Sequence, residues 1–435
     1  MRALVVNPWI TDFKLYDEWM HPLGLYAVIS FLVQNGWEVD YIDLLGRDPE
    51  SKTKRYNTGA FPSIHIPAPS PLNTIPRKYK RYGVSDEKCA RQLRYLPRPD
   101  VVFIGSGMTY WIDGLRITVA KIRESLPDTP IVIGGIAASL VPEAVCRSLR
   151  GFRGVSVIGG PLTEAAKRLT LFGNDRIGHW RFSLLDLRGI VTTPFHAPVL
   201  ATLGCPLRCS YCASRKLQPS FQIRDPETIF REIRFFASQR GIGDFSFYDD
   251  ALLFRAEQTI IPLAKKLGIS GLRLRFHTPN GLHLRYVTEA VAHALAETGF
   301  RTLRFGYESG NRRFKHDTNG KSERALVAQK VGHLFKHGFC RKDIGIYVMA
   351  GLPGQKHDEV IEEVEFIGSL GVQAKPVFLS PVPFTGLYEQ YKVRFPEIAI
   401  NPLLHNDIYF VTIMDGWSWE QAEEVREAAR RVNTR

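Results

Sequence analysis

Short apolar runs alternate with amphipathic segments over residues 1–165. The apolar runs have the length of strands and end at Asn, Asp or Gly; they lie at 2–6, 37–42, 101–105, 130–133 and 155–158. Apolar residues at helical spacing occupy the intervening segments 23–34, 114–125 and 142–149. This alternation predicts a flavodoxin-like parallel sheet, in which the carboxyl ends of the strands share one edge and form a ligand crevice.

Residues 46–100 interrupt this pattern with a proline-rich, basic insert. Seven prolines between positions 62 and 99 disfavour long regular elements, and the run 77–82 interleaves basic and aromatic residues. Two interpretations remain for the insert. It is either a solvated covering segment whose tyrosines pack on the sheet, or a patch for an anionic partner such as nucleic acid, a nucleotide or a cofactor phosphate.

A second strand–helix rhythm follows residues 166–196, which we expect to be a linker. Its strands are expected at 199–203, 245–249, 272–278, 302–307, 344–350 and 374–379, with helices at 226–239, 257–267, 288–297, 322–336 and 356–370. Six such units predict a partial (β/α)6 barrel over 197–390 rather than a closed eightfold barrel. The tail, 391–435, contains a charged helix from 419 to 432 that either covers the open side of the barrel or packs on its exterior.

Composition changes this picture in two ways. The 435 residues are 44% hydrophobic with a net charge of +13, and residues 51–100 alone hold eleven Lys or Arg against three acidic residues. A substrate or partner with negative charge suits this balance.

No apolar stretch approaches the roughly 18 residues of a membrane span, and the first apolar run stops at Pro8, too early for a signal peptide. With only six cysteines, we expect a protein of the reducing cytoplasm.

Three of the six cysteines lie together directly after the strand expected at 199–203. Cys205, Cys209 and Cys212 have C-x3-C-x2-C spacing. Structural zinc usually takes four ligands in paired sets, and no second pair is nearby. Thiolates are the usual ligands of iron–sulfur clusters, and three of them leave one iron of a four-iron cluster open. The cysteines at 89, 146 and 340 are isolated, and we expect them to be buried structural thiols.

This spacing, with an aromatic residue just before the third cysteine, resembles the radical SAM superfamily. The resemblance implies a [4Fe-4S] cluster on Cys205, Cys209 and Cys212, S-adenosylmethionine on the open iron, and a 5′-deoxyadenosyl radical formed by reductive cleavage. It also implies a one-electron reductant such as flavodoxin or ferredoxin. The residues implied for S-adenosylmethionine binding lie at strand ends: Tyr211, Tyr248, Asp249, Asp250, Glu308, Ser309, Tyr347 and Met349. Alternatively, Asp249 caps the following segment and Glu308 pairs with Arg304.

The first half resembles the cobalamin-binding domain that precedes many radical SAM domains. The matching pieces are 5–8, 22–25, 39–43, 133–135 and 159–164. The resemblance implies cobalamin as a cofactor, with candidate residues Met108, Thr109, Tyr110, Gly134, Gly135, Gly159 and Gly160. Because no Asp-x-His-x-x-Gly follows the first strand, cobalamin would bind without a histidine beneath the cobalt. The alternative is a flavodoxin-like sheet kept for architecture or substrate binding.

Three classes of function follow. The first is a cobalamin-dependent radical SAM enzyme that transfers a methyl group to an unactivated carbon or phosphorus centre of an unknown substrate. The second is a cobalamin-free radical SAM enzyme acting on RNA or a nucleotide, like a methylthiotransferase. The third is a non-catalytic iron–sulfur protein that binds nucleic acid. In the first two classes, His277 and Asn280 at the barrel mouth are candidate substrate residues, although His277 equally suits a satisfied barrel histidine.

Overall fold

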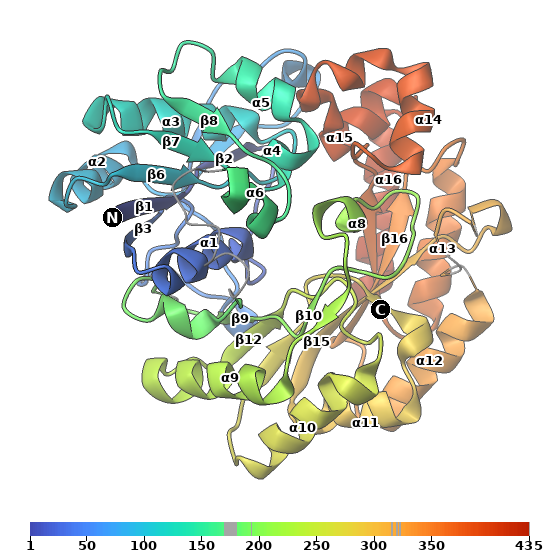
Figure 1. Cartoon of the computed structure of the whole chain (residues 1–435). Helices are drawn as coiled ribbons and strands as arrows, with labels where there is room; N and C mark the ends of the chain where they lie inside the picture. Colours follow the sequence, from blue (N-terminus) through green and yellow to red (C-terminus); the bar gives the residue numbers. More distant parts are fainter. Residues whose placement is uncertain (169–180, 193, 315, 319–320, 322, 435) are drawn as a thin grey trace. The chain divides into compact units, whose positions relative to one another are not determined.

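The computed structural model describes residues 1–168, 181–192, 194–314, 316–318, 321 and 323–434 (Figure 1). The linker expected over 166–196 therefore lies partly outside the described residues. The chain divides into two compact units. The N-terminal unit comprises 1–195 with 397–405, and the barrel unit comprises 196–396 with 406–435.

The N-terminal unit is built on a parallel five-stranded sheet of order β3-β1-β6-β7-β8. Its strands are β1 (Arg2–Asn7), β3 (Glu38–Asp43), β6 (Val101–Ile104), β7 (Ile131–Ile133) and β8 (Val155–Val157). The helices between them are α1 (Leu23–Gln34), α3 (Ile112–Ser125), α4 (Ile136–Leu140) and α5 (Pro142–Ser148), with α6 (Leu162–Arg168) after β8. This strand order is that of flavodoxin-like folds, and it confirms the fold class that the sequence predicts.

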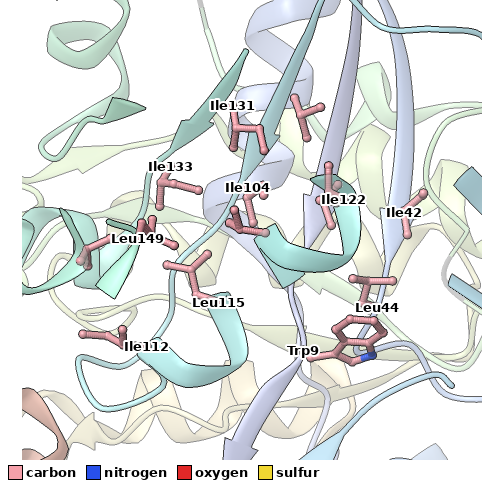
Figure 2. Close-up of a cluster of buried hydrophobic side chains, with 14 of the residues drawn as sticks. Trp9, Ile42, Leu44, Ile104, Ile112, Leu115, Ile122, Ile131, Ile133 and Leu149 are labelled. Atoms are coloured by element: carbon pink, nitrogen blue, oxygen red, sulfur yellow. The ribbon is translucent and has the colours of Figure 1, made fainter. Parts of the chain in front are cut away.

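Helices cover both faces of this sheet, which explains why β1 and β6 are buried on both sides. On one face Ile104 and Ile133 pack against α3, as Figure 2 shows, and Trp9 is fully buried in the same cluster. The Trp9 indole N–H donates to the Val84 carbonyl at 2.8 Å, so the ring is buried without an unpaired donor. On the other face Leu25 of α1 approaches Gly105 so closely that a Cβ there would lie 3.1 Å from it.

The insert is more regular than its prolines suggest. β4 (Ser63–His65) and β5 (Lys80–Tyr82) form an antiparallel sheet with β2 (Ile10–Asp12), in the order β2-β5-β4. A helix that the sequence analysis did not anticipate, α2 (Asp86–Tyr95), begins at Ser85, whose hydroxyl accepts from the Lys88 N–H. Pro62 precedes β4, the prolines at 67–76 lie between β4 and β5, and those at 97 and 99 follow α2, so none falls within a strand or helix of the insert.

The barrel unit contains a seven-stranded sheet with a main path β17-β16-β15-β13-β12-β9, and β14 beside β15. Its strands are β9 (Ala197–Val199), β12 (Asp244–Phe247), β13 (Arg275–His277), β14 (Leu282–His283), β15 (Phe300–Glu308), β16 (Ile344–Ala350) and β17 (Gln373–Phe378). The pairings along this path are parallel, which confirms the partial barrel. A small antiparallel pair, β10 (Thr202–Leu203) with β11 (Gln222–Ile223), branches off after β9.

Helices follow the strands and cover one face of the barrel sheet. They are α9 (Pro226–Arg240), α10 (Ile260–Ile269), α11 (Glu289–Thr298), α12 (Arg324–Lys336) and α13 (His357–Ser369), with the short α8 (Ser214–Leu217) after the cysteines. Local sequence sets their ends: Asp225 caps α9, Pro226 occupies its first turn, and Gly241 ends it at a φ of +67°.

The tail is divided between the two units. The helix α16 (Trp419–Thr434) packs on α13 and β17, and Asn433 bonds both the N–H and the carbonyl of Ala374. This helix therefore packs on the exterior of the barrel. α14 (Gly386–Arg394) and α15 (Asp407–Tyr409) lie in the same unit, whereas 397–405 belongs to the N-terminal unit. Among the described residues, no helix is long and apolar enough to span a membrane.

Candidate cluster and cofactor site

The cysteine loop is anchored where it leaves β9. The fully buried carboxylate of Asp249 accepts hydrogen bonds from the Ala201 N–H at 3.0 Å, from the Thr202 N–H, and from the Thr202 hydroxyl at 2.7 Å. Burial raises the pKa of Asp249 to about 6, and the bonds from Thr202 and Ala201 oppose that rise. Asp249 thus fixes the chain just before the first cysteine, rather than capping the segment that follows it.

Two further backbone contacts hold the middle of the loop. The Ser210 N–H donates to the Asp317 carbonyl at 3.0 Å, and the Leu387 N–H donates to the Ser210 carbonyl at 2.9 Å. A turn brings the Cys212 N–H to the Cys209 carbonyl at 3.2 Å. Segments far apart in the sequence therefore fix the conformation of the loop.

The three thiols lie close enough to affect one another's ionisation. Burial raises the pKa of Cys205 to about 11, and it also raises the pKa of Cys209 against the opposing effect of Lys321. Cys212 is the most exposed of the three. Within the described ranges, no group of three His, Cys, Asp or Glu side chains converges on a position for one metal ion. A four-iron cluster binds each thiolate through a different iron, so its ligands need not converge in this way.

A partly buried polar triad adjoins this loop. The Tyr211 hydroxyl donates to Glu308 Oε1 at 2.9 Å, and Lys321 Nζ lies 3.0 Å from both that oxygen and the Tyr211 hydroxyl. The side chains of Glu308 and Lys321 are at most one-tenth exposed. Burial by itself would lower the pKa of Lys321, but the charge and hydrogen bond of Glu308 together with the nearby Cys209 and Cys212 outweigh it, and the net pKa is raised. Glu308 therefore pairs with Lys321 and not with Arg304.

The backbone at the end of β15 is shaped around this triad. Glu308 adopts a φ of +71°, a conformation that is unfavourable for a residue with a side chain, at a register shift between β15 and β16. A Cβ on Gly306 would lie 2.5 Å from Glu308 Oε1 and 2.9 Å from Lys321 Nζ. Gly306 is therefore required for the Glu308 carboxylate and the Lys321 ammonium to lie against the strand.

A second network supports the same strand end from the helix side. The Tyr307 hydroxyl donates to Glu363 Oε2 at 2.7 Å, and Arg324 reaches Glu363 Oε1 at 3.0 Å. Ser309, one of the predicted binding residues, is buried directly after the triad. The turn at 308–310 is therefore fixed on one side by the triad and on the other by the network of Tyr307, Glu363 and Arg324.

The other predicted strand-end residues surround the loop at different depths. Asp250 accepts from the Ser214 hydroxyl, and Cys212 Sγ lies 3.2 Å from that same hydroxyl. The Asn280 amide donates to the Tyr248 carbonyl at 2.8 Å. Tyr347 donates to the Pro279 carbonyl at 2.8 Å, and Met349 is buried further along β16. The structure thus groups Tyr211 and Glu308 closely with the cysteines, whereas Asp249 lies behind them.

His277 lies deeper in the barrel. Its Nε2 is 3.0 Å from Asp244 Oδ1, and Arg275 donates twice to the same buried carboxylate. Burial would raise the pKa of Asp244, but Arg275 and His277 outweigh it and lower the pKa to about 2. His277 therefore has a structural partner, and its substrate role remains a prediction.

The candidate cobalamin residues gather at the carboxyl edge of the N-terminal sheet. Gly135 has a φ of +99°, and a Cβ there would lie 2.5 Å from the Ser106 carbonyl; at Gly159 it would lie 2.3 Å from the Ala138 carbonyl. The Gly160 N–H donates to the Ser139 hydroxyl at 2.8 Å, and the Gly134 carbonyl accepts from Ser106 at 2.6 Å. Glycine is thus needed for the loops after β7 and β8 to pack this closely.

Apolar side chains are exposed at the same edge. Met108 follows β6 with 47% exposure, and Ile136 follows β7 with 39%. Tyr110 and Thr109 are buried beside Met108, and the Thr109 hydroxyl is 2.8 Å from His405 Nδ1. His405 Nε2 in turn contacts the Ile398 carbonyl at 2.8 Å, so both ring nitrogens of this histidine have partners within the unit.

Sequence reasoning missed Lys321 and was wrong about two cysteines. Lys321 follows a short Asn-Gly pair with no recognisable motif, so no sequence signal connects it with Glu308. Cys89 is buried as predicted, but Cys146 and Cys340 are exposed. Cys340 lies in the turn after α12, where its thiol contacts Asp343 at 2.9 Å instead of entering the core.

Comparison with known proteins finds a family model that matches part of the barrel unit. Residues 199–367 match the family model described as the radical SAM superfamily. This segment therefore matches a radical SAM domain, and the chain as a whole is similar in fold to solved structures of a radical SAM methyltransferase.

Three relatives show the extent of the likeness. Bacteriochlorophyllide d C-12(1)-methyltransferase of Chlorobaculum tepidum is 29% identical over 45% of this chain, a match that spans 43% of that relative. Cytidylyl-2-hydroxyethylphosphonate methyltransferase of Streptomyces wedmorensis is 22% identical, and the match covers 99% of this chain and 89% of the relative. The structure of the methyltransferase TsrM from Kitasatospora setae with cobalamin and a [4Fe-4S] cluster aligns with a TM-score of 0.62 at 16% identity, covering 90% of this chain and 75% of TsrM.

Proposed function

We propose that this chain is a cobalamin-dependent radical SAM methyltransferase for an anionic substrate. The observation that carries the proposal is the placement of Cys205, Cys209 and Cys212 beside the Tyr211–Glu308–Lys321 triad at the carboxyl edge of the barrel. When bound, the cluster with S-adenosylmethionine supplies a 5′-deoxyadenosyl radical, and cobalamin carries the methyl group. We expect the electron to come from a flavodoxin or ferredoxin in a reducing cytoplasm.

The residues of the barrel unit have separate tasks. The three thiolates hold the cluster, and Asp249 fixes the start of their loop by accepting from Ala201 and Thr202. Glu308, held by Tyr211 and Lys321, has a carboxylate suited to the ribose hydroxyls of S-adenosylmethionine. Asp250, Tyr248, Ser309, Tyr347 and Met349 surround this position as the remaining candidate contacts.

The N-terminal unit fits cobalamin through backbone and apolar surface. A corrin ring is flat and largely apolar at its faces, and Met108 and Ile136 expose apolar side chains at the edge where ligands of this fold bind. The glycines at 134, 135, 159 and 160 let the loops there come close to a ligand. His405 is engaged on both nitrogens, so we expect binding without a histidine beneath the cobalt.

An anionic substrate is supported by the barrel's inner face. Arg304 on β15 and Lys375 on β17 flank β16, in register with Gly345 and Tyr347. Because side chains alternate along a strand, Arg304 and Lys375 lie on the face of the sheet opposite to that of the fully buried Ile346 and Ala374. The name of the Streptomyces relative specifies a phosphonate substrate, which is also anionic.

The experiment is anaerobic reconstitution followed by three measurements. We expect about four irons per chain, cleavage of S-adenosylmethionine to 5′-deoxyadenosine with dithionite, and near-stoichiometric retention of hydroxocobalamin after desalting, with a spectrum typical of the base-off form. Cluster and cleavage without cobalamin retention would favour the cobalamin-free enzyme, with RNA or a nucleotide at the basic insert. Stoichiometric zinc without visible absorbance would contradict the proposal as a whole.

A further inference from the structure

Arg47 is a buried arginine of the N-terminal unit whose donors are only partly used. Its side chain is 2% exposed, and Nη1 donates to Asp17 Oδ2 at 2.9 Å and to the Asn57 carbonyl at 2.8 Å. Nε and Nη2 are buried as well, and neither has a partner among the residues that the structure describes. Buried polar groups are almost always hydrogen-bonded, because an unmet donor keeps its full cost of desolvation. A ligand that accepts from these two atoms would remove this cost.

The two unpaired nitrogens form one edge of the guanidinium. The N–H of Nε and one N–H of Nη2 are parallel in any arginine, because the group is planar. Two parallel N–H groups at this spacing match two oxygens of a carboxylate or a phosphate, which accept from them as a bidentate pair. The unpaired edge of Arg47 therefore has the shape and the charge that an oxyanion requires.

A second buried arginine of the same unit has its paired donors occupied. Nη1 and Nη2 of Arg81 donate to the two carboxylate oxygens of Asp86 at 3.0 and 2.6 Å. Both arginines lie over an aromatic ring, with Arg81 Cζ 4.3 Å from the Trp9 centroid and Arg47 Cζ 4.1 Å from that of Phe195. The two environments thus differ in one respect. The chain supplies an acceptor for the paired donors of Arg81, and none of the described residues supplies one for the unpaired edge of Arg47.

The backbone beside Arg47 fixes the guanidinium in place. Tyr56 and Asn57 adopt φ angles of +57° and +59°, which are unfavourable for residues with side chains, and the Asn57 carbonyl accepts from Nη1. A Cβ on Gly59 would lie 2.2 Å from Nη2, so glycine is needed for the backbone to lie this close to the guanidinium. The local structure therefore holds Arg47 in one orientation without using two of its donors.

Two further buried hydroxyls lie on the segments that hold Arg47. Tyr16 directly precedes Asp17, and Ser51 belongs to the segment that follows Arg47; neither hydroxyl has a partner among the described residues. Lys54 Nζ lies 5.4 Å from the Tyr16 ring centroid, which adds a second cation to this part of the unit. A bound oxyanion has more lone pairs than one arginine edge can satisfy, and hydroxyls are suitable additional donors.

Arg47 lies away from the glycine loops considered for cobalamin. It follows β3, the edge strand of the N-terminal sheet, whereas those loops follow β7 and β8. Two strands, β1 and β6, separate β3 from β7. With about 4.8 Å between neighbouring strands, this places the ends of β3 and β7 about 14 Å apart.

We propose that Arg47 binds the oxyanion of a small ligand, a phosphate or a carboxylate group, in the N-terminal unit. Nε and Nη2 are the bidentate donors, and Asp17 holds the guanidinium through Nη1. The hydroxyls of Tyr16 and Ser51 are the additional donors. The inference goes beyond the proposed function and does not depend on it, since it requires neither the cluster nor S-adenosylmethionine.

The test is equilibrium dialysis of the full chain against inorganic phosphate, and separately against acetate, at constant ionic strength. The parent should bind one of these probes saturably, with or without the cluster. Arg47→Lys keeps a positive charge beside Asp17 but loses the bidentate edge. The Kd should therefore rise about tenfold or more, because hydrogen bonds to a charged group are lost. Ser51→Ala removes one hydroxyl and should weaken binding less.

Arg81→Lys is the matched control, because Arg81 is also buried and ion-paired but has its paired donors on Asp86. It should leave the Kd unchanged. A parental Kd in Arg47→Lys, or an equal rise in both lysine variants, would overturn the assignment. A parent that binds neither probe would also overturn it, since water would then satisfy the unpaired edge. Competition by cobalamin but not by cobinamide, which lacks the phosphate, would assign this edge to that cofactor and contradict an independent site.

Discussion

The two parallel sheets of this chain present very different carboxyl edges. At the barrel edge, Glu308 is buried, Tyr211 and Lys321 are partly buried, and the three side chains are hydrogen-bonded to one another. At the N-terminal edge, the close contacts are made by glycine backbones, and Met108 and Ile136 expose apolar side chains. Under the proposed function, the contrast assigns the two edges to two different kinds of ligand. A charged, polar cofactor requires fixed side-chain donors and acceptors, whereas a large flat macrocycle requires room and apolar surface.

The strongest test of this contrast removes a cluster ligand. Cys209→Ala should abolish iron and sulfide binding, since a cluster held by only three thiolates cannot spare one. The measurement is iron and sulfide analysis with the visible spectrum after anaerobic reconstitution. Cys340→Ala is the matched control, because that thiol is exposed and contacts Asp343. If Cys209→Ala kept the parental cluster, the ligand assignment would be wrong.

A substitution in the Tyr211–Glu308–Lys321 triad should have a smaller effect, a loss of affinity for S-adenosylmethionine. Glu308→Gln keeps the size of the side chain but removes its charge, so the Kd for S-adenosylmethionine should rise about tenfold to a hundredfold with the cluster intact. Cobalamin retention, measured in the same preparation, should not change. A parental Kd would mean that Glu308 serves the structure of the loop and does not contact the cofactor.

The strand–helix rhythm predicted both sheets correctly, because hydrophobic periodicity is a local property. The assignment of Cys205, Cys209 and Cys212 as cluster ligands follows from their spacing and stays a prediction. The contact of Lys321 with Glu308 was not predicted, since it depends on the close packing at Gly306. The role of Asp249 was also hidden, because its partners at 201 and 202 are distant in sequence.

The barrel edge also depends on a charged group deeper in the sheet. The folded-state pKa of Asp244 is about 2, against an ordinary value of 3.8. A depressed carboxyl pKa stabilises the fold above the unfolded-state pKa, and this contribution, about 2 kcal/mol, is lost as the pH falls from about 4 to about 2. Urea unfolding between about pH 5 and about pH 3 should show a steeper loss of stability for the parent than for Asp244→Asn. Asp358→Asn, at an exposed aspartate, should follow the parent, and equal slopes for all three proteins would refute the prediction.

The smallest expected effect tests the N-terminal edge directly. Met108→Asp places a charge where we expect the corrin ring, and leaving that charge poorly solvated should weaken cobalamin binding about tenfold. Because Met108 is 47% exposed, the substitution should cost the fold little. Ile64→Asp is a close control: Ile64 is 49% exposed in the same unit, but it lies on β4 of the insert. Spectroscopic titration with hydroxocobalamin should therefore separate the two variants. Equal weakening in both would point to a general effect of charge or stability, and no weakening in either would place cobalamin away from the loop after β6.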